Sequence, residues 1–126
     1  LDEISKNWIT SQKKINSDKK LRFFKTHNML GKFRGHPFTN SENTLGAIYI
    51  VRDPRNLISS LTHHYSLNYN KSYSILLNEN QTLLEKSRDE DYSNFTFTGS
   101  WSNHYKSWKN TNDFNTLFII YGSYQY

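Results

Sequence analysis

Apolar positions recur along this chain of 126 residues at two spacings, and each spacing predicts one kind of element. In residues 2–16, Ile4, Trp8 and Ile15 recur at the spacing of an amphipathic helix. Short continuous runs of apolar residues are typical of β-strands. On these two criteria we expect two further helices (residues 74–88 and 100–109), two strands (residues 21–26 and 117–121) and a loop at residues 28–45.

A strand that turns directly into a helix is the clearest pattern in the chain. Residues 47–51 are all apolar, which predicts a strand covered on both faces. Asp53 is a good helix N-cap and Pro54 suits the first helical position, so a helix is expected to run to about Tyr65. Strands therefore alternate with helices. The predicted class is α/β with a mainly parallel sheet flanked by helices.

The predicted helix after Pro54 has two distinct faces. Leu57 and Leu61 belong to its apolar stripe, together with Ile58 and Tyr65. A polar stripe lies at positions i, i+4 and i+8: Asn56, Ser60 and His64.

Composition narrows the class of protein. Hydrophobic residues make up 35% and aromatic residues 16% of the chain, so we expect one domain with a core built largely from Phe, Tyr and Trp. The chain has no cysteine, which excludes disulfides and thiol catalysis and is compatible with a cytoplasmic protein. The chain contains no run of about 18 apolar residues, so no transmembrane helix is predicted.

The net charge of +5 is unevenly distributed. Residues 1–55 contain eleven Lys and Arg against five Asp and Glu, whereas residues 56–126 contain five against six. One interpretation is a solvated basic face. The other is a pocket for an anionic ligand.

Arg52 and Ser60 are candidates for holding such an anion. In open α/β sheets, ligands bind beyond the carboxyl ends of the strands, where Arg52 lies. The guanidinium offers a planar fork of donors that matches a phosphate, and Ser60 adds a hydroxyl from the polar stripe. The alternative is that Arg52 pairs with Asp53 and that Ser60 faces solvent.

Lys25 and His27 lie at the end of the other predicted strand. If the two strands are neighbours, both ends open into one crevice. A histidine there can accept a proton from an attacking hydroxyl or amine, and a lysine can stabilise charge on a leaving oxygen. The alternative for a lone histidine is a structural role. The remaining histidines lack partners at ligand spacing, so we predict no metal site, and we interpret His104, among aromatic residues, as structural.

Three segments, in order, resemble the sulfotransferases that use 3′-phosphoadenosine-5′-phosphosulfate (PAPS). Residues 24–27 (Phe-Lys-Thr-His) are similar to the element that carries the catalytic base of that family. Residues 50–60 are similar to its 3′-phosphate segment, with an Arg and a Ser eight positions apart. Residues 99–108 are similar to its Gly-Ser-Trp helix, and residues 117–121 to the strand that follows.

The resemblance implies a role for each matching residue. His27 would take the proton from the acceptor hydroxyl, and Lys25 would neutralise charge at the transferring group. Arg52 and Ser60 would bind the 3′-phosphate of PAPS. The implied fold is that of the P-loop nucleoside kinases, a parallel sheet between helices.

Some parts of the family pattern are not found in residues 1–126. We expect its 5′-phosphosulfate loop to lie before Leu1 and its C-terminal closing segment after Tyr126, so that residues 1–126 form a single partial domain, incomplete at both ends. Thr98 stands where the family often has an aromatic residue that touches the adenine. Gly122 and Ser123 stand where it commonly has an acidic pair.

We therefore expect a PAPS-dependent transfer of a sulfuryl group to a small-molecule or carbohydrate acceptor. A first alternative is a catalytically silent nucleotide-binding or interaction remnant of the same fold. A second is a nucleic-acid binder, suggested by basic charge interleaved with aromatic residues, although no recognised motif supports it. The residues do not identify the acceptor or the oligomeric state.

Overall fold

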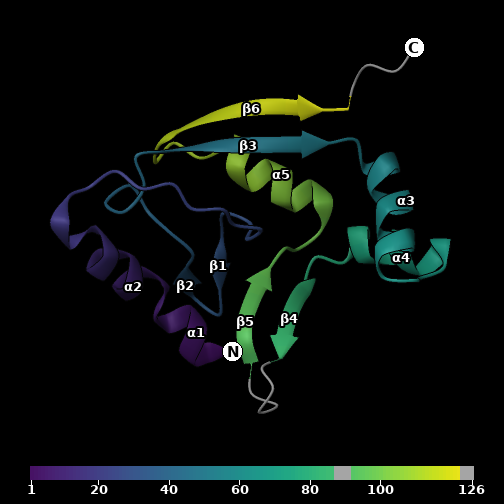
Figure 1. Cartoon of the computed structure of the whole chain (residues 1–126), viewed down its shortest axis with the longest axis horizontal. Coiled ribbons are helices and arrows are strands. Elements are labelled where there is room, and N and C mark those ends of the chain that lie inside the picture. The colour runs from purple at the N-terminus through teal and green to yellow at the C-terminus, as the bar shows by residue number, and fades with distance from the viewer. Residues whose placement is uncertain (87–91, 123–126) are drawn as a thin grey trace.

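Six strands form three two-stranded sheets in residues 1–86 and 92–122, the part of the chain that the computed structural model describes (Figure 1). The helices are α1 (Asp2–Lys6), α2 (Trp8–Ile15), the 3₁₀ helix η1 (Asn16–Asp18), α3 (Pro54–His64), α4 (Tyr69–Leu77) and α5 (Trp101–Lys109). The strands are β1 (Lys32–Phe33), β2 (His36–Pro37), β3 (Gly46–Arg52), β4 (Thr82–Lys86), β5 (Tyr92–Phe97) and β6 (Asn115–Tyr121). None of the helices in these ranges has the length and apolar character needed to cross a bilayer.

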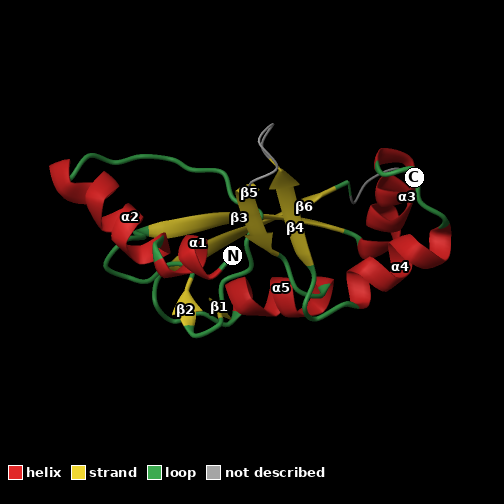
Figure 2. Cartoon of the chain, turned by 90° about the horizontal axis from the view of Figure 1, so that it is seen from below, coloured by secondary structure: helices red, strands yellow, loops and turns green. Residues whose placement is uncertain are grey.

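The central sheet is the parallel pair β3–β6, in register from Gly46 opposite Asn115 to Arg52 opposite Tyr121. This pair confirms the two predicted strands and agrees with an α/β class. Helix α5 covers one face of the pair, as Figure 2 shows from below. Its contacts there are aromatic: the Trp108 ring centroid lies 6.3 Å from that of Tyr49 on β3, and the Tyr105 centroid lies 5.6 Å from that of Phe118 on β6.

The opposite face of β3–β6 is open, and the prediction that β3 is covered on both faces is therefore wrong. Ile48 is 61% and Ile50 66% exposed, and their partners Leu117 and Ile119 are also exposed. An unbroken apolar run shows that a strand can be buried on both sides. It does not show that a second layer is present.

The predicted helix over residues 74–88 is only partly present: residues 74–77 belong to α4, and residues 82–86 form a strand. Helix α4 ends at Leu77, and β4 then pairs with β5 in an antiparallel sheet, with Leu84 opposite Phe95. Apolar pairs at helical spacing also fit a short strand, and here the long-range pairing with β5 decides. Residues 87 and 88 of the predicted helix lie outside the described residues.

Residues 21–26 do not form the predicted strand either. Phe23 is 85% and Phe24 69% exposed, and within the described ranges this segment makes no ladder with a neighbouring strand. A strand depends on its partner for its backbone hydrogen bonds, so an apolar run without one stays irregular. Arg22 in this segment contacts residues that precede it: its guanidinium donates two hydrogen bonds of 2.6 Å to the carboxylate of Asp18.

Residues 28–45 form the predicted loop, with one short addition. Strands β1 and β2 make a hairpin whose two turn residues, Arg34 and Gly35, have φ angles of 50° and 86°. Two successive positive φ angles define the type I′ turn that suits a two-residue hairpin.

The interior is aromatic, as the composition predicted. Phe95 is only 2% exposed; its ring stacks on Trp8 with 5.9 Å between centroids and packs against the tilted ring of Phe33 at 4.6 Å. These contacts join α2, the β1–β2 hairpin and β5 into one cluster beside the central sheet.

Candidate functional site

The junction between β3 and α3 has the geometry that the sequence predicted. Asp53 is the N-cap of α3, and its Oδ1 accepts a hydrogen bond of 2.8 Å from the backbone N–H of Arg55. Pro54 occupies the first helical position, where its missing N–H costs nothing. The turn is thus built from local contacts, and it places Arg52 at the end of the strand next to a helix N-terminus.

Arg55, and not Arg52, neutralises Asp53. The Arg55 Nε lies 3.0 Å from Oδ1 of Asp53 and its Nη2 2.5 Å from Oδ2. These side-chain bonds lower the pKa of the Asp53 carboxyl to about 2. The guanidinium of Arg52 instead lies 5.9 Å from the centre of the Tyr121 ring, and no carboxylate in the described part of the chain pairs with it. The alternative in which Arg52 pairs with Asp53 is therefore not what the structure shows.

A shallow hollow of about 560 Å³ opens beside this junction. Its lining combines Arg52 with residues of α3, namely Asn56, Ser59, Ser60, His63 and His64. The predicted polar stripe of α3 therefore faces one shared space with Arg52. A guanidinium, hydroxyls and an amide around one opening suit an anion with several oxygen atoms.

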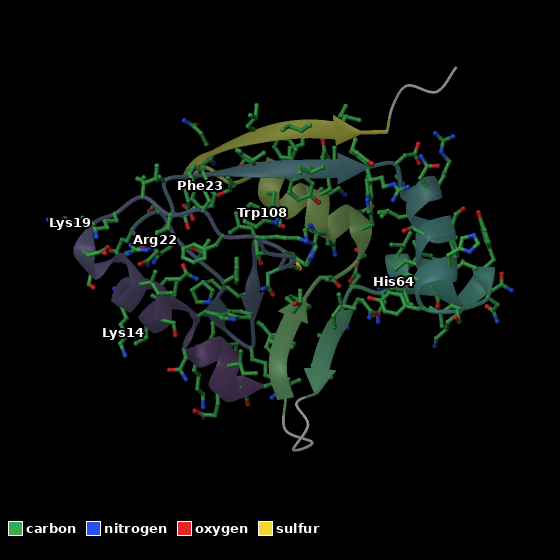
Figure 3. All side chains as sticks on the ribbon, in the orientation of Figure 1. Lys14, Lys19, Arg22, Phe23, His64 and Trp108 are labelled. Atoms are coloured by element: carbon green, nitrogen blue, oxygen red, sulfur yellow. The ribbon has the colours of Figure 1, made fainter. Side chains whose placement is uncertain are left out.

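Lys25 and His27 do not line this hollow. Both side chains are exposed, in the irregular segment that precedes β1. In Figure 3, Phe23 of that segment and His64 of α3 lie on opposite sides of Trp108. The expected crevice, shared by two neighbouring strand ends, is not formed, because the segment is not paired with β3.

The backbone next to His27 is nevertheless well anchored. The carbonyl oxygen of His27 lies 3.1 Å from Nε2 of His104, and Nδ1 of His104 lies 2.8 Å from the hydroxyl of Tyr49. Burial lowers the pKa of His104 and raises the pKa of Tyr49 to about 12. Sequence reasoning placed His104 among aromatic residues but missed its bond to His27. The only signal was its position in the Gly-Ser-Trp segment.

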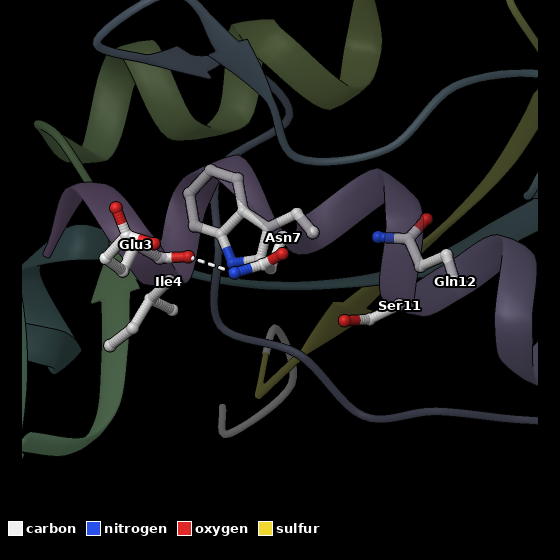
Figure 4. A pocket seen from close by; sticks show the side chains of 6 residues that line it. Glu3, Ile4, Asn7, Ser11 and Gln12 are labelled. Atoms are coloured by element: carbon white, nitrogen blue, oxygen red, sulfur yellow. Dashed lines mark hydrogen bonds between the residues drawn. The ribbon is translucent and has the colours of Figure 1, made fainter.

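A second hollow, of about 460 Å³, lies along α1 and α2 (Figure 4). Its lining is Glu3, Ile4, Asn7, Trp8, Ser11 and Gln12. Asn7 Nδ2 is already used, since it donates a bond of 2.7 Å to the carbonyl oxygen of Glu3. No cationic side chain lines this hollow, so it is a poor site for a phosphate or sulfate group.

Metal ligands do not gather in the described residues. No group of three or more His, Cys, Asp or Glu side chains lies together within those ranges.

Comparison with known proteins gives one match. A family model described as "Sulfotransferase domain" matches residues 4–125. No curated protein and no solved structure matches the chain.

Proposed function

Because the chain belongs to the sulfotransferase domain family, whose model matches residues 4–125, we propose that it transfers a sulfuryl group from PAPS to a hydroxyl or amine acceptor. Family membership implies sulfuryl transfer in general. The donor, the base and the individual residue roles are our proposal. The observation that carries it is the family match together with Arg52, which ends β3, lines one hollow with the polar face of α3 and pairs with no carboxylate in the described part of the chain.

The residues around the β3–α3 junction fit the 3′-phosphate of the donor. Arg52 would hold it through the guanidinium fork, and Ser60 would add a hydroxyl bond from the same hollow. The N-terminus of α3 adds a favourable field for an anion. The bound donor supplies the sulfuryl group, and these residues orient it.

We assign His27 as the general base and Lys25 as its cationic neighbour. His27 would take the proton from the acceptor hydroxyl as the oxygen attacks sulfur, and Lys25 would stabilise negative charge on the leaving phosphate. Both side chains are exposed and therefore reachable by an acceptor. In such transfers, in-line positioning and charge stabilisation provide most of the acceleration.

We also propose the finer architecture that the family resemblance implies. Residues 1–126 would be part of one sulfotransferase domain with a fold like the P-loop nucleoside kinases. The parallel β3–β6 pair followed by α3 is compatible with this fold. The acceptor, whether phenol, alcohol, amine or carbohydrate, is not specified by any contact.

The test uses the full-length protein with radiolabelled PAPS and a set of acceptors: a phenol, an aliphatic alcohol, an amine and a monosaccharide. We expect transfer to at least one of them. The variant His27→Ala should lower the rate by about 10²- to 10⁴-fold, the usual contribution of general base catalysis, while still binding desulfated nucleotide (PAP). His36→Ala, at a histidine outside the proposed site, is the matched control.

The outcomes separate the alternatives. Unchanged turnover in His27→Ala removes His27 from the mechanism. No transfer to any acceptor by a wild-type protein that binds PAP supports the catalytically silent remnant.

A further inference from the structure

Three side chains of α5 bind the backbone at and just after His27. His104 Nε2 lies 3.1 Å from the carbonyl oxygen of residue 27, and Trp108 Nε1 donates a bond of 3.1 Å to the carbonyl oxygen of residue 28. Ser107 Oγ accepts a bond of 3.0 Å from the N–H of residue 30. The three lie at i, i+3 and i+4, so they share one face of the helix. We call His104, Ser107 and Trp108 the backbone anchor.

The same segment is held from a second direction by β5. Asn28 is buried, and its Oδ1 accepts a bond of 2.8 Å from the N–H of Phe97. The N–H of Met29 donates a bond of 2.8 Å to the carbonyl oxygen of Phe97. The backbone after His27 is thus fixed between α5 and β5, whereas the backbone before it has no strand partner in the described residues.

The hydrogen bonds determine the protonation of His104. A carbonyl oxygen can only accept, so Nε2 of His104 must carry a hydrogen that it donates to His27. Burial lowers the pKa of the His104 imidazole and so favours its neutral form. Nδ1 is then an acceptor, and the hydroxyl of Tyr49 donates to it at 2.8 Å. The carbonyl of His27 therefore fixes the tautomer of His104, and Tyr49 on β3 holds the orientation of the ring.

We propose that His104 is a positioning residue for His27, which it locates by holding its carbonyl oxygen, with Tyr49 fixing the His104 ring. This inference rests on the proposed function, because it supposes that His27 is the base. Residues 21–26 make no ladder within the described ranges, so the anchored carbonyl is the nearest fixed point to the His27 imidazole. Releasing it lets the base move by a distance that matters for proton transfer.

The test compares four variants of the full-length protein. His104→Phe keeps a ring but loses both bonds, His104→Gln keeps a donor for the carbonyl, and Tyr49→Phe removes only the hydroxyl. Lys106→Ala, at an exposed position of the same helix, is the control. The measurements are kcat for transfer, KM for PAPS, the Kd of PAP, and hydrogen exchange of the amides of residues 28–30.

We expect His104→Phe to lower kcat by about 10²-fold, the usual cost of misplacing a catalytic group by about 1 Å. KM for PAPS and the Kd of PAP should stay within about twofold, because nucleotide contacts are untouched. The amides of residues 28–30 should exchange faster. His104→Gln should keep most of the wild-type kcat. The kcat of Tyr49→Phe should lie between those of His104→Phe and His104→Gln.

Two results would overturn the inference. One is that kcat and the exchange of the amides of residues 28–30 are both unchanged in His104→Phe. If that variant does not fold, an unchanged kcat and unchanged exchange in Tyr49→Phe would overturn the inference instead. The other concerns the double variant: if adding His104→Phe to His27→Ala lowers kcat by the same factor as in the wild-type background, His104 does not act through His27. If the wild-type protein transfers nothing, the proposed function fails, and hydrogen exchange alone decides whether His104 holds the segment.

Discussion

Replacing Arg52 with alanine is the sharpest test of the nucleotide site. The Arg52 guanidinium reaches the hollow on α3 and has no carboxylate partner in the described part of the chain. Its donors are therefore available to a 3′-phosphate without first breaking an ion pair. Arg55, three positions away, is already held by Asp53 and does not line the hollow.

The expected loss follows from this difference. A hydrogen bond to a charged group contributes about 1.5–3 kcal/mol, and the guanidinium fork can make two of them. Even in a hollow open to water, we therefore expect Arg52→Ala to cost about 2–3 kcal/mol in PAP binding. This corresponds to an increase of about 30- to 150-fold in Kd. Arg55→Ala removes an exposed and already paired charge, so its effect should stay below about threefold.

The assay is calorimetric titration of the full-length protein with PAP and with adenosine 5′-phosphate, which lacks the 3′-phosphate, at one fixed ionic strength. Arg52→Ala should abolish most of the preference for PAP. The reasoning is refuted if the Kd of PAP is unaltered, or if both nucleotides lose the same factor. In the second case Arg52 acts elsewhere on the nucleotide or on the fold.

Two further predictions concern stability, measured by urea unfolding. The folded-state pKa of Asp53 is lowered to about 2 from an ordinary value of 3.8, chiefly by the side chain of Arg55. Its stabilising contribution should therefore be complete above about pH 4 and should be lost as the pH falls toward 2. Asp53→Asn should flatten that part of the pH profile, and an unchanged profile would contradict the ionic pairing of Asp53 with Arg55. Phe95→Ala should lower the free energy of unfolding by about 3–5 kcal/mol, because Phe95 is almost fully buried. Phe23→Ala, at an exposed ring, should change it by less than about 0.5 kcal/mol. Equal effects of the two substitutions would mean that Phe95 does not lie in the core.

The β3–α3 junction was predictable because its determinants are neighbours in the chain. The apolar run, the Asp53 cap and Pro54 act within one turn of each other, and the structure reproduces each of them. The N-cap of α5 is equally local: Ser100 Oγ accepts a bond of 3.3 Å from the N–H of Asn103. The polar stripe of α3 also followed from helix geometry alone, and the structure places Asn56, Ser60 and His64 of that stripe around one hollow with Arg52.

The failures all involve a partner far away in the sequence. Residues 21–26 would form a strand only if a neighbouring strand accepted and donated their backbone hydrogen bonds. Residues 82–86 do form a strand because β5 pairs with them. Helical periodicity and strand composition overlap in short apolar runs, so the sequence leaves such segments undecided. Tertiary pairing then selects one state.

The sequence by itself thus determined the local chemistry of this protein: the strand–cap–helix junction, the polar face of α3 and the aromatic character of the core. Only the tertiary structure decided which apolar runs became strands, since residues 82–86 pair with β5 whereas residues 21–26 have no strand partner in the described part of the chain. It alone also joined His104 to His27, across 77 positions of sequence. The reason is physical. Caps and stripes depend on contacts within a few residues, whereas ladders and buried hydrogen bonds depend on which distant segments fold against each other.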